Sequence, residues 1–289
     1  MQQKQKQDFV DSPINYSGNK YKLLPKLAPL FPEHIDVLYD LFCGGGAISA
    51  NIEANRVVAN DINHFVLDIL TEFRDNNAED TIRKIHHIIN AHSLSIDNKE
   101  SYNEFRDYYN HVNKTPLNLF VLSCFSFNYQ FRFNKKGEYN NASGYNSAQY
   151  NPNIEQKIID FSPLLQNVTF TKSNVFDIDM SVISEDDFVY LDPPYSNSTA
   201  SYNDGKRHFG GWSTEDDKRL FDILDDLSLR GVRWGMSNAF VNKGIENEHL
   251  IEWSRKYHCF TFEHNKYTTN YQRKGEKKTV EVYIANYRK

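Results

Sequence analysis

The segment Asp192-Pro193-Pro194-Tyr195 carries the most specific chemical signal in the chain, and it follows the apolar run 188–191. Its two prolines fix the backbone and remove two N–H donors. The segment therefore presents acceptors, the Asp192 carboxylate and the Pro193 carbonyl, beside the Tyr195 ring. Such a set suits a planar group with an exocyclic amine, since the acceptors take its two N–H bonds and the tyrosine stacks on the ring. A rigid turn with an ordinary acid is the alternative interpretation.

A glycine-rich turn, Asp40-Leu41-Phe42-Cys43-Gly44-Gly45-Gly46, follows a second apolar run that begins at Val37. Glycines at the carboxyl end of a strand allow a tight turn and a close approach of backbone to a ligand. The run lacks the spaced third glycine of the dinucleotide-binding pattern. A ligand-binding loop and a plain turn both remain open on this motif alone.

Two further segments complete the set of motifs, and one of them has a chemical interpretation by itself. Asp61 ends the buried run 56–60, where a carboxylate can accept both hydroxyls of a ribose or cap a helix. Tyr16-Ser17-Gly18-Asn19-Lys20 predicts, by itself, only a turn followed by a helix.

These motifs need an α/β scaffold to bring them together. Strand-like runs at 37–42 and 56–60 alternate with helical spacing at 47–54 and 63–73, which indicates a parallel sheet. The pattern resumes after 160, with a helix expected over 215–229 and a strand over 232–236. The segments 260–267 and 279–287 predict a hairpin closed by the basic loop 270–278. The intervening region is helical and polar, then rich in aromatic residues and asparagine. We expect a disordered tail over 1–10, one α/β domain over 11–75 and 161–289, and an inserted domain over 76–160.

Composition excludes several classes of protein. The 289 residues are 39% hydrophobic and 14% aromatic, which is enough for a core, and no apolar run reaches the length of a membrane span. Three distant cysteines predict neither a disulfide framework nor a metal site, and they favour a cytoplasmic protein. The net charge of −5 is unlike that of a general nucleic-acid binder, although basic residues gather at 132–136 and after 265.

In this order, the four motifs resemble the Dam family of N6-adenine-specific DNA methyltransferases, in which a target-recognition segment interrupts the catalytic domain. Tyr16, Gly18 and Lys20 match its first motif, and the run 40–46 matches the acidic-Pro-Phe-x-Gly-x-Gly motif, with leucine in place of proline. Asp61 and the 192–195 box supply the other two. The resemblance extends over about 14–287 and includes Arg132-Phe133-Asn134, the segment 137–140, Ser237-Asn238 and the C-terminal basic hairpin.

The resemblance implies a Rossmann-like mixed sheet that uses S-adenosylmethionine, with a mostly helical inserted DNA-recognition domain. The residues 192–195 would form the catalytic box. Asp177 would border the donor adenine, with a surface acid or helix cap as the alternative. The donor-site positions carried over are Tyr16, Gly18, Lys20, Asp40, Phe42, Gly44, Asp61, Asp177 and Asp192.

The same resemblance implies duplex DNA as partner, with the target adenine flipped out of the helix. Arg132 would read a guanine, and Phe127 with Asn128 would enter the duplex, unless they are ordinary core residues. Tyr129, Gln130 and Phe131 depart from the best-known members. The recognised motif is therefore open between GATC and another short motif that contains adenine. The remaining expected DNA contacts are Asn134, Lys135, Lys136, Arg273, Lys274, Lys277 and Lys278.

Other functions fit the sequence less well. A related enzyme could methylate another planar amine, on RNA, cytosine or a protein glutamine, but Asp192 favours adenine, since related boxes carry serine or asparagine there. A non-catalytic DNA-binding descendant is disfavoured because every chemical position is occupied. Nothing supplies the acid or base of a nicotinamide dehydrogenase. A separately acting restriction endonuclease, or a phage or regulatory context, stays open, and no obligate protein partner is implied.

Overall fold

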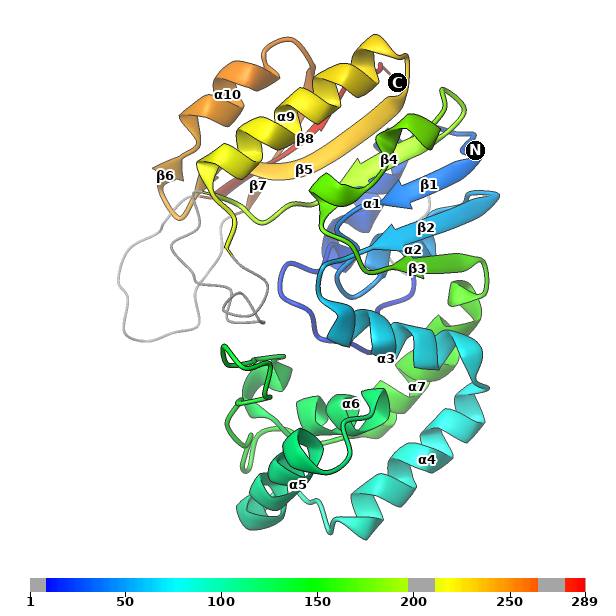
Figure 1. Cartoon of the computed structure of the whole chain (residues 1–289), viewed down its shortest axis with the longest axis vertical. Coiled ribbons are helices and arrows are strands. Elements are labelled where there is room, and N and C mark those ends of the chain that lie inside the picture. The colour runs from blue at the N-terminus through cyan, green and yellow to red at the C-terminus, as the bar shows by residue number, and fades with distance from the viewer. Residues whose placement is uncertain (1–8, 197–210, 265–278, 289) are drawn as a thin grey trace.

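The computed structural model describes residues 9–196, 211–264 and 279–288, and a single mixed sheet runs through them (Figure 1). Its strand order is β3-β2-β1-β4-β5-β8-β7, and β6 pairs with β5. Strands β1 to β5 are parallel, whereas β8 runs antiparallel to both β5 and β7. The bounds are β1 Val37–Asp40, β2 Arg56–Asn60, β3 Val168–Thr171, β4 Phe188–Leu191, β5 Arg233–Asn242, β6 Ile245–Glu246, β7 His258–His264 and β8 Thr279–Ala285.

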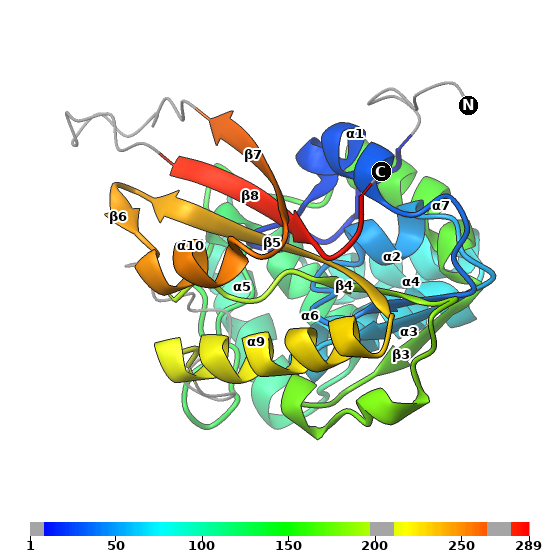
Figure 2. The same ribbon diagram turned by 90° about the horizontal axis from the view of Figure 1, so that it is seen from above.

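The centre of the sheet is buried on both faces because the strand there is apolar. In β4 all four side chains are buried, and they alternate between two cores. Phe188 and Tyr190 face one core, whereas Val189 and Leu191 face the other. Figure 2 shows α1 and α2 on one side of the sheet and α9 on the other. The bounds of the flanking helices are α1 Leu24–Leu27, α2 Ala47–Asn51, α3 His64–Asp75, α9 Thr214–Leu229 and α10 Glu248–Ser254.

Residues between α3 and β3 form the second part of the molecule, which is mainly helical and lies beside α3 (Figure 1). Each helix begins at a residue whose side chain accepts a backbone N–H, namely Asn77, Asn98, Thr115 and Asn151. The central helix, α6, is buried on all sides, and α3 and α4 pack against it. The bounds are α4 Ala78–Ala91, α5 Lys99–His111, α6 Pro116–Cys124 and α7 Pro152–Phe161.

The predicted fold class, a mixed α/β sheet, is confirmed, but several local expectations are wrong. Phe9 is buried and the Val10 N–H donates to Asn51 Oδ1 at 2.7 Å, so these two residues do not belong to the expected tail. Strand β5 continues to Asn242, well past the expected end at Met236, because β8 pairs with its second half. The helices α7 and α10 were not predicted. Within the described part of the chain, no helix is both long and apolar enough to cross a bilayer.

The close approach of β5 to a buried tyrosine gives a stability prediction. A Cβ on Gly235 would lie 1.9 Å from Tyr283 Oη, and that ring is fixed by a 2.7 Å hydrogen bond to Tyr287 Oη. We expect Gly235→Ala to destabilise the protein by about 1–3 kcal/mol through overpacking. Equilibrium urea unfolding measures this loss. Gly211→Ala is the control, because nothing lies within 4 Å of its Cβ position, and equal midpoints for the two variants would contradict the prediction.

Candidate active site

The predicted site residues meet at the carboxyl ends of the central strands. Asp40 ends β1, Asp61 follows β2 and Asp192 follows β4. Strands β2 and β3 lie on one side of β1, whereas β4 and β5 lie on the other. At such a topological switch point the loops leave a crevice in which α/β proteins bind ligands. The segment that precedes α1 brings Tyr16 against the glycine loop and Lys20 against Asp192.

Lys20 and Asp192 form an ion pair although 172 positions separate them. Lys20 is 7% exposed, and its Nζ donates to Asp192 Oδ2 and, at 3.0 Å, to the Gly18 carbonyl. The same Nζ lies 5.7 Å from the centre of the Tyr195 ring. Burial lowers the pKa of Lys20, but the Asp192 carboxylate outweighs it and raises that pKa above its usual value. Burial raises the pKa of Asp192, and the ammonium of Lys20 opposes that rise.

The glycine loop holds the second carboxylate. The Gly44 N–H donates to Asp61 Oδ2 and the Asn63 N–H to Asp61 Oδ1, both at 2.8 Å. Gly44 has φ +48°, and a Cβ there would lie 2.7 Å from the Tyr16 ring, so glycine is required for that ring to lie on the loop. A carboxylate oxygen accepts more than one hydrogen bond. The fixed orientation of Asp61 therefore suits a ligand with adjacent hydroxyls.

Asp40 is the third carboxylate, and it is 1% exposed. Ser49 Oγ donates to its Oδ2 at 2.6 Å, whereas its Oδ1 has no hydrogen-bond partner among the residues that the structure describes. Burial, reinforced by the charges of Asp192 and Asp61, raises the pKa of Asp40 to about 7. A buried carboxylate oxygen without a partner is costly. This atom therefore fits a ligand that brings a hydrogen-bond donor, above all a cationic one.

An aromatic cluster borders the crevice and includes a residue that the sequence analysis missed. The Trp212 ring meets Phe42 edge-on at 5.5 Å and stacks on Phe176 at 5.7 Å. Asp177, the expected neighbour of the donor adenine, is exposed on the 3-10 turn after β3. Phe176 lies within the segment 174–177 that was expected to border the donor adenine, although Asp177 and not Phe176 was the residue selected there.

The turn 127–130 presents an exposed aromatic side chain on a strained backbone. Asn128 and Tyr129 have φ of +55° and +54°, a conformation that non-glycine residues seldom adopt. Phe127 is 50% exposed, so the alternative that it is a core residue is wrong. Donors that hold the carbonyls of this turn are Asn141 Nδ2 to Phe127 O and Gln130 O, Tyr139 Oη to Gln130 O, and Asn15 Nδ2 to Asn128 O, at 2.9–3.0 Å.

A short hairpin follows, closed by the bridge between Phe133 and Tyr139. The Asn134 side chain builds its turn, because Oδ1 accepts the N–H groups of Lys136 and Glu138 and Nδ2 donates to Glu138 Oε2. Lys135 and Lys136 are exposed at its tip, and Arg132 is half-buried. The expected contacts at Arg273, Lys274, Lys277 and Lys278 lie outside the described residues.

Three features define a Rossmann-like methyltransferase: the strand order, the glycine loop with the acid that follows it, and the acceptor box, which is the segment 192–195. The chain belongs to the D12 class N6 adenine-specific DNA methyltransferase family, whose model matches residues 16–266. The resemblance to the Dam family is thereby confirmed.

Three relatives illustrate the range of similarity. "Type II methyltransferase M.FokI" of Planomicrobium okeanokoites is 41% identical over 281 residues, and "Modification methylase StsI" of Streptococcus sanguinis is 37% identical over 283. Each match covers 96% of this chain and 43% of the relative, so the chain spans less than half the length of these relatives. "DNA adenine methylase" of Escherichia coli K12 is 25% identical over 232 residues, which is 78% of this chain and 79% of that protein.

The buried Asp40 carboxyl predicts a specific dependence of stability on pH. Its pKa is about 7 in the folded protein and 3.8 in its ordinary state. Between those values the folded protein keeps a proton that the unfolded chain has lost, so this group's contribution to stability falls as pH rises from about 4 to about 7. We expect Asp40→Asn, which stays neutral, to lose less stability than the wild type between pH 5 and 7.5, by an order of a few kcal/mol. Urea unfolding at both pH values measures this difference, and parallel pH profiles would refute the assignment.

Proposed function

We propose that the chain transfers a methyl group from S-adenosylmethionine to the N6 amine of an adenine flipped out of a short duplex DNA motif. The observation that carries the proposal is the half-buried Asp192 carboxylate, which is paired with the buried Lys20 and followed by Pro193 and Tyr195. It lies at the same sheet edge as Asp40 and Asp61, so an amine acceptor and a nucleoside site share one crevice.

The residues of the crevice fit this donor. S-adenosylmethionine supplies an electrophilic methyl group on a sulfonium. Asp61 would accept the ribose hydroxyls, and the unpartnered Oδ1 of Asp40 would accept from the ammonium group. The glycine loop with Tyr16 would lie along the donor, and Phe42 would contact its nucleoside. Gly18, Lys20 and Asp177 complete the proposed donor site.

Catalysis would follow from positioning and charge. The Asp192 carboxylate and the Pro193 carbonyl accept the two N–H bonds of the target amine, which localises its lone pair toward the methyl group. Tyr195 stacks on the base, and Pro194 keeps the box rigid. As the new N–C bond forms, the bond between the methyl carbon and the sulfonium sulfur would break and leave a neutral thioether, and the amine nitrogen would lose a proton that Asp192 would accept. The ammonium of Lys20 favours the ionised form of Asp192, because it opposes the rise in pKa that burial causes.

DNA binding is assigned to the inserted segment. Phe127 and Asn128 would enter the duplex as the base leaves, Arg132 would read a guanine, and Lys135 and Lys136 would contact phosphates. Asn134 would serve through the turn that it builds. The basic positions after 270 would add phosphate contacts. The recognised motif is GATC or another short motif containing adenine, and a cytoplasmic, restriction–modification role belongs to the same proposal.

Expression in a methylase-deficient bacterial host, followed by methylation-sensitive sequencing of its plasmid, tests the function. We expect N6-methyladenine in one short motif. Asp192→Asn keeps the shape of the box but removes the carboxylate, so we expect it to bind S-adenosylmethionine and to lose at least about 100-fold in methyl transfer. Wild-type turnover by this variant would contradict the role of Asp192. Absence of modified adenine, with the wild type binding the donor, would point to another acceptor.

The exposed ring on the strained turn gives a prediction for base flipping. Phe127→Ala removes the ring, so we expect roughly tenfold or greater loss of methylated product, since base–aromatic stacking is worth about 1–3 kcal/mol. Stability should change by no more than about 0.5 kcal/mol, because the side chain is half exposed. Fluorescence of 2-aminopurine at the target position of the methylated motif measures flipping.

Leu229→Ala is the matched control, since Leu229 is 89% exposed at the end of α9, remote from the inserted segment. It should flip and methylate like the wild type. Unchanged flipping in Phe127→Ala would rule out the wedge role.

A further inference from the structure

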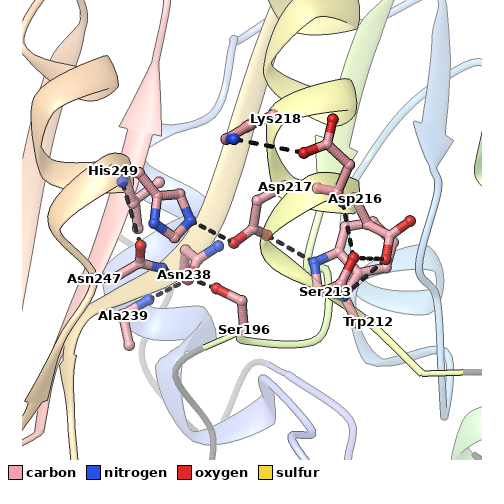
Figure 3. Close-up of polar contacts among 12 residues, drawn as sticks. Ser196, Trp212, Ser213, Asp216, Asp217, Lys218, Asn238, Ala239, Asn247 and His249 are labelled. Atoms are coloured by element: carbon pink, nitrogen blue, oxygen red, sulfur yellow. Dashed lines mark hydrogen bonds and ion pairs between the residues drawn. The ribbon is translucent and has the colours of Figure 1, made fainter.

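A carboxylate outside the catalytic box is completely buried between α9 and α10. Asp217 is 0% exposed and lies in the first turn of α9. Trp212 Nε1 donates to its Oδ1 at 2.7 Å, and His249 Nε2 contacts its Oδ2 at 2.9 Å (Figure 3). The neighbouring acid Glu215 is exposed and Asp216 is only half-buried, so the position in the helix does not by itself require full burial. Burying a carboxylate costs free energy unless hydrogen bonds compensate, and here those bonds come from two side chains.

The indole held by Asp217 reaches the edge of the donor crevice. Its ring lies between Phe42, on the loop after β1, and Phe176, on the turn after β3. Phe42 comes two positions before Gly44, whose N–H fixes Asp61. Arg219, one turn along α9 from the start of the helix, lies 4.2 Å from the Phe176 ring centre. Trp212 therefore joins the two loops that flank the proposed donor nucleoside.

The first turn of α10 also contacts the residue after the catalytic box. Asn247 caps this helix, and its Nδ2 lies 3.5 Å from Ser196 Oγ. His249, two positions on, contacts Asp217 (Figure 3). The first turn of α10 is thus connected to the residue after the acceptor box and also, through Asp217, to the Trp212 ring.

We propose that Asp217 and His249 are positioning residues that orient the Trp212 indole as a wall of the donor-nucleoside pocket. The inference rests on the proposed function. An indole has a single N–H, so one acceptor in a fixed place sets the rotation of the whole ring. A carboxylate accepts from the indole and from an imidazole at once, and His249 in turn fixes the carboxylate. Packing alone would need no buried charge at this position.

Isothermal titration of the full chain with S-adenosylmethionine, and separately with S-adenosylhomocysteine, tests the proposal. The variants are Trp212→Phe, Asp217→Asn and His249→Gln. We expect each to weaken binding of both ligands about 3- to 10-fold, as for loss of a hydrogen bond. The KM for the donor should rise by the same factor, whereas kcat at saturating donor should stay within about twofold. Lys218→Ala is the matched control, because its ion pair with Glu215 is exposed on the same helix turn (Figure 3).

A double variant separates positioning from a purely structural role. Trp212→Phe has no N–H to orient, so adding His249→Gln should weaken binding little further. Full additivity, or wild-type donor affinity in the folded single variants, would overturn the proposal. His249 has a 30% exposed side chain, so its variant should fold even where Asp217→Asn does not. Failure of the wild type itself to bind either ligand would instead refute the proposed donor, and this inference with it.

Discussion

The partly buried ion pair of Lys20 and Asp192 is the contact on which the arrangement of the site depends. It connects the segment before α1 to the end of β4, two parts of the chain that share no backbone hydrogen-bond ladder. Removing either partner would leave an uncompensated buried charge, which costs several kcal/mol. The pair also determines which atoms face the crevice, since the Lys20 ammonium occupies one oxygen of Asp192 and lies over the face of Tyr195. This ion pair therefore fixes the position of the acceptor box relative to the glycine loop.

The inserted segment is attached to the same region by its aromatic residues. Phe133, in the hairpin that carries the exposed lysines, stacks on Phe65 with ring centres 4.1 Å apart. Phe65 belongs to the first turn of α3, directly downstream of Asp61. Lys114 donates to the Gly137 carbonyl at 2.8 Å and lies over the Phe65 ring, which fastens the hairpin from the other side. The acid of the donor site and the candidate DNA-reading hairpin are thus placed by one helix, so their separation is set by packing.

The sequence predicted the elements that depend on local pattern and missed those that depend on tertiary contact. Strands with continuous apolar runs, such as 188–191, and the four motifs were found because each is contiguous. Trp212 was missed because its partners, Phe42, Phe176 and Asp217, come from three separate elements. The length of β5 was underestimated because its second half is extended only by pairing with β8.

The surroundings of individual side chains could not be predicted from sequence patterns either. Asn134 looked like a residue available to DNA, yet its amide builds the hairpin turn. The exposure of Phe127 follows from two left-handed residues after it, which no composition signal predicts. The unpartnered oxygen of Asp40 likewise becomes visible only when its surroundings are known.

The three carboxylates of the crevice differ because each has a different partner. Asp192 faces a lysine ammonium, Asp61 accepts backbone N–H groups, and Asp40 has only a serine hydroxyl. Burial is the main reason that the pKa of Asp40 rises to about 7, and the charges of Asp192 and Asp61 in the same crevice add to it. A ligand with an ammonium group relieves this cost and leaves Asp192 to the target amine. In the proposed mechanism, the electrostatics of the crevice would thus divide the carboxylates between a cationic donor and a neutral acceptor, as methyl transfer to an adenine amine requires.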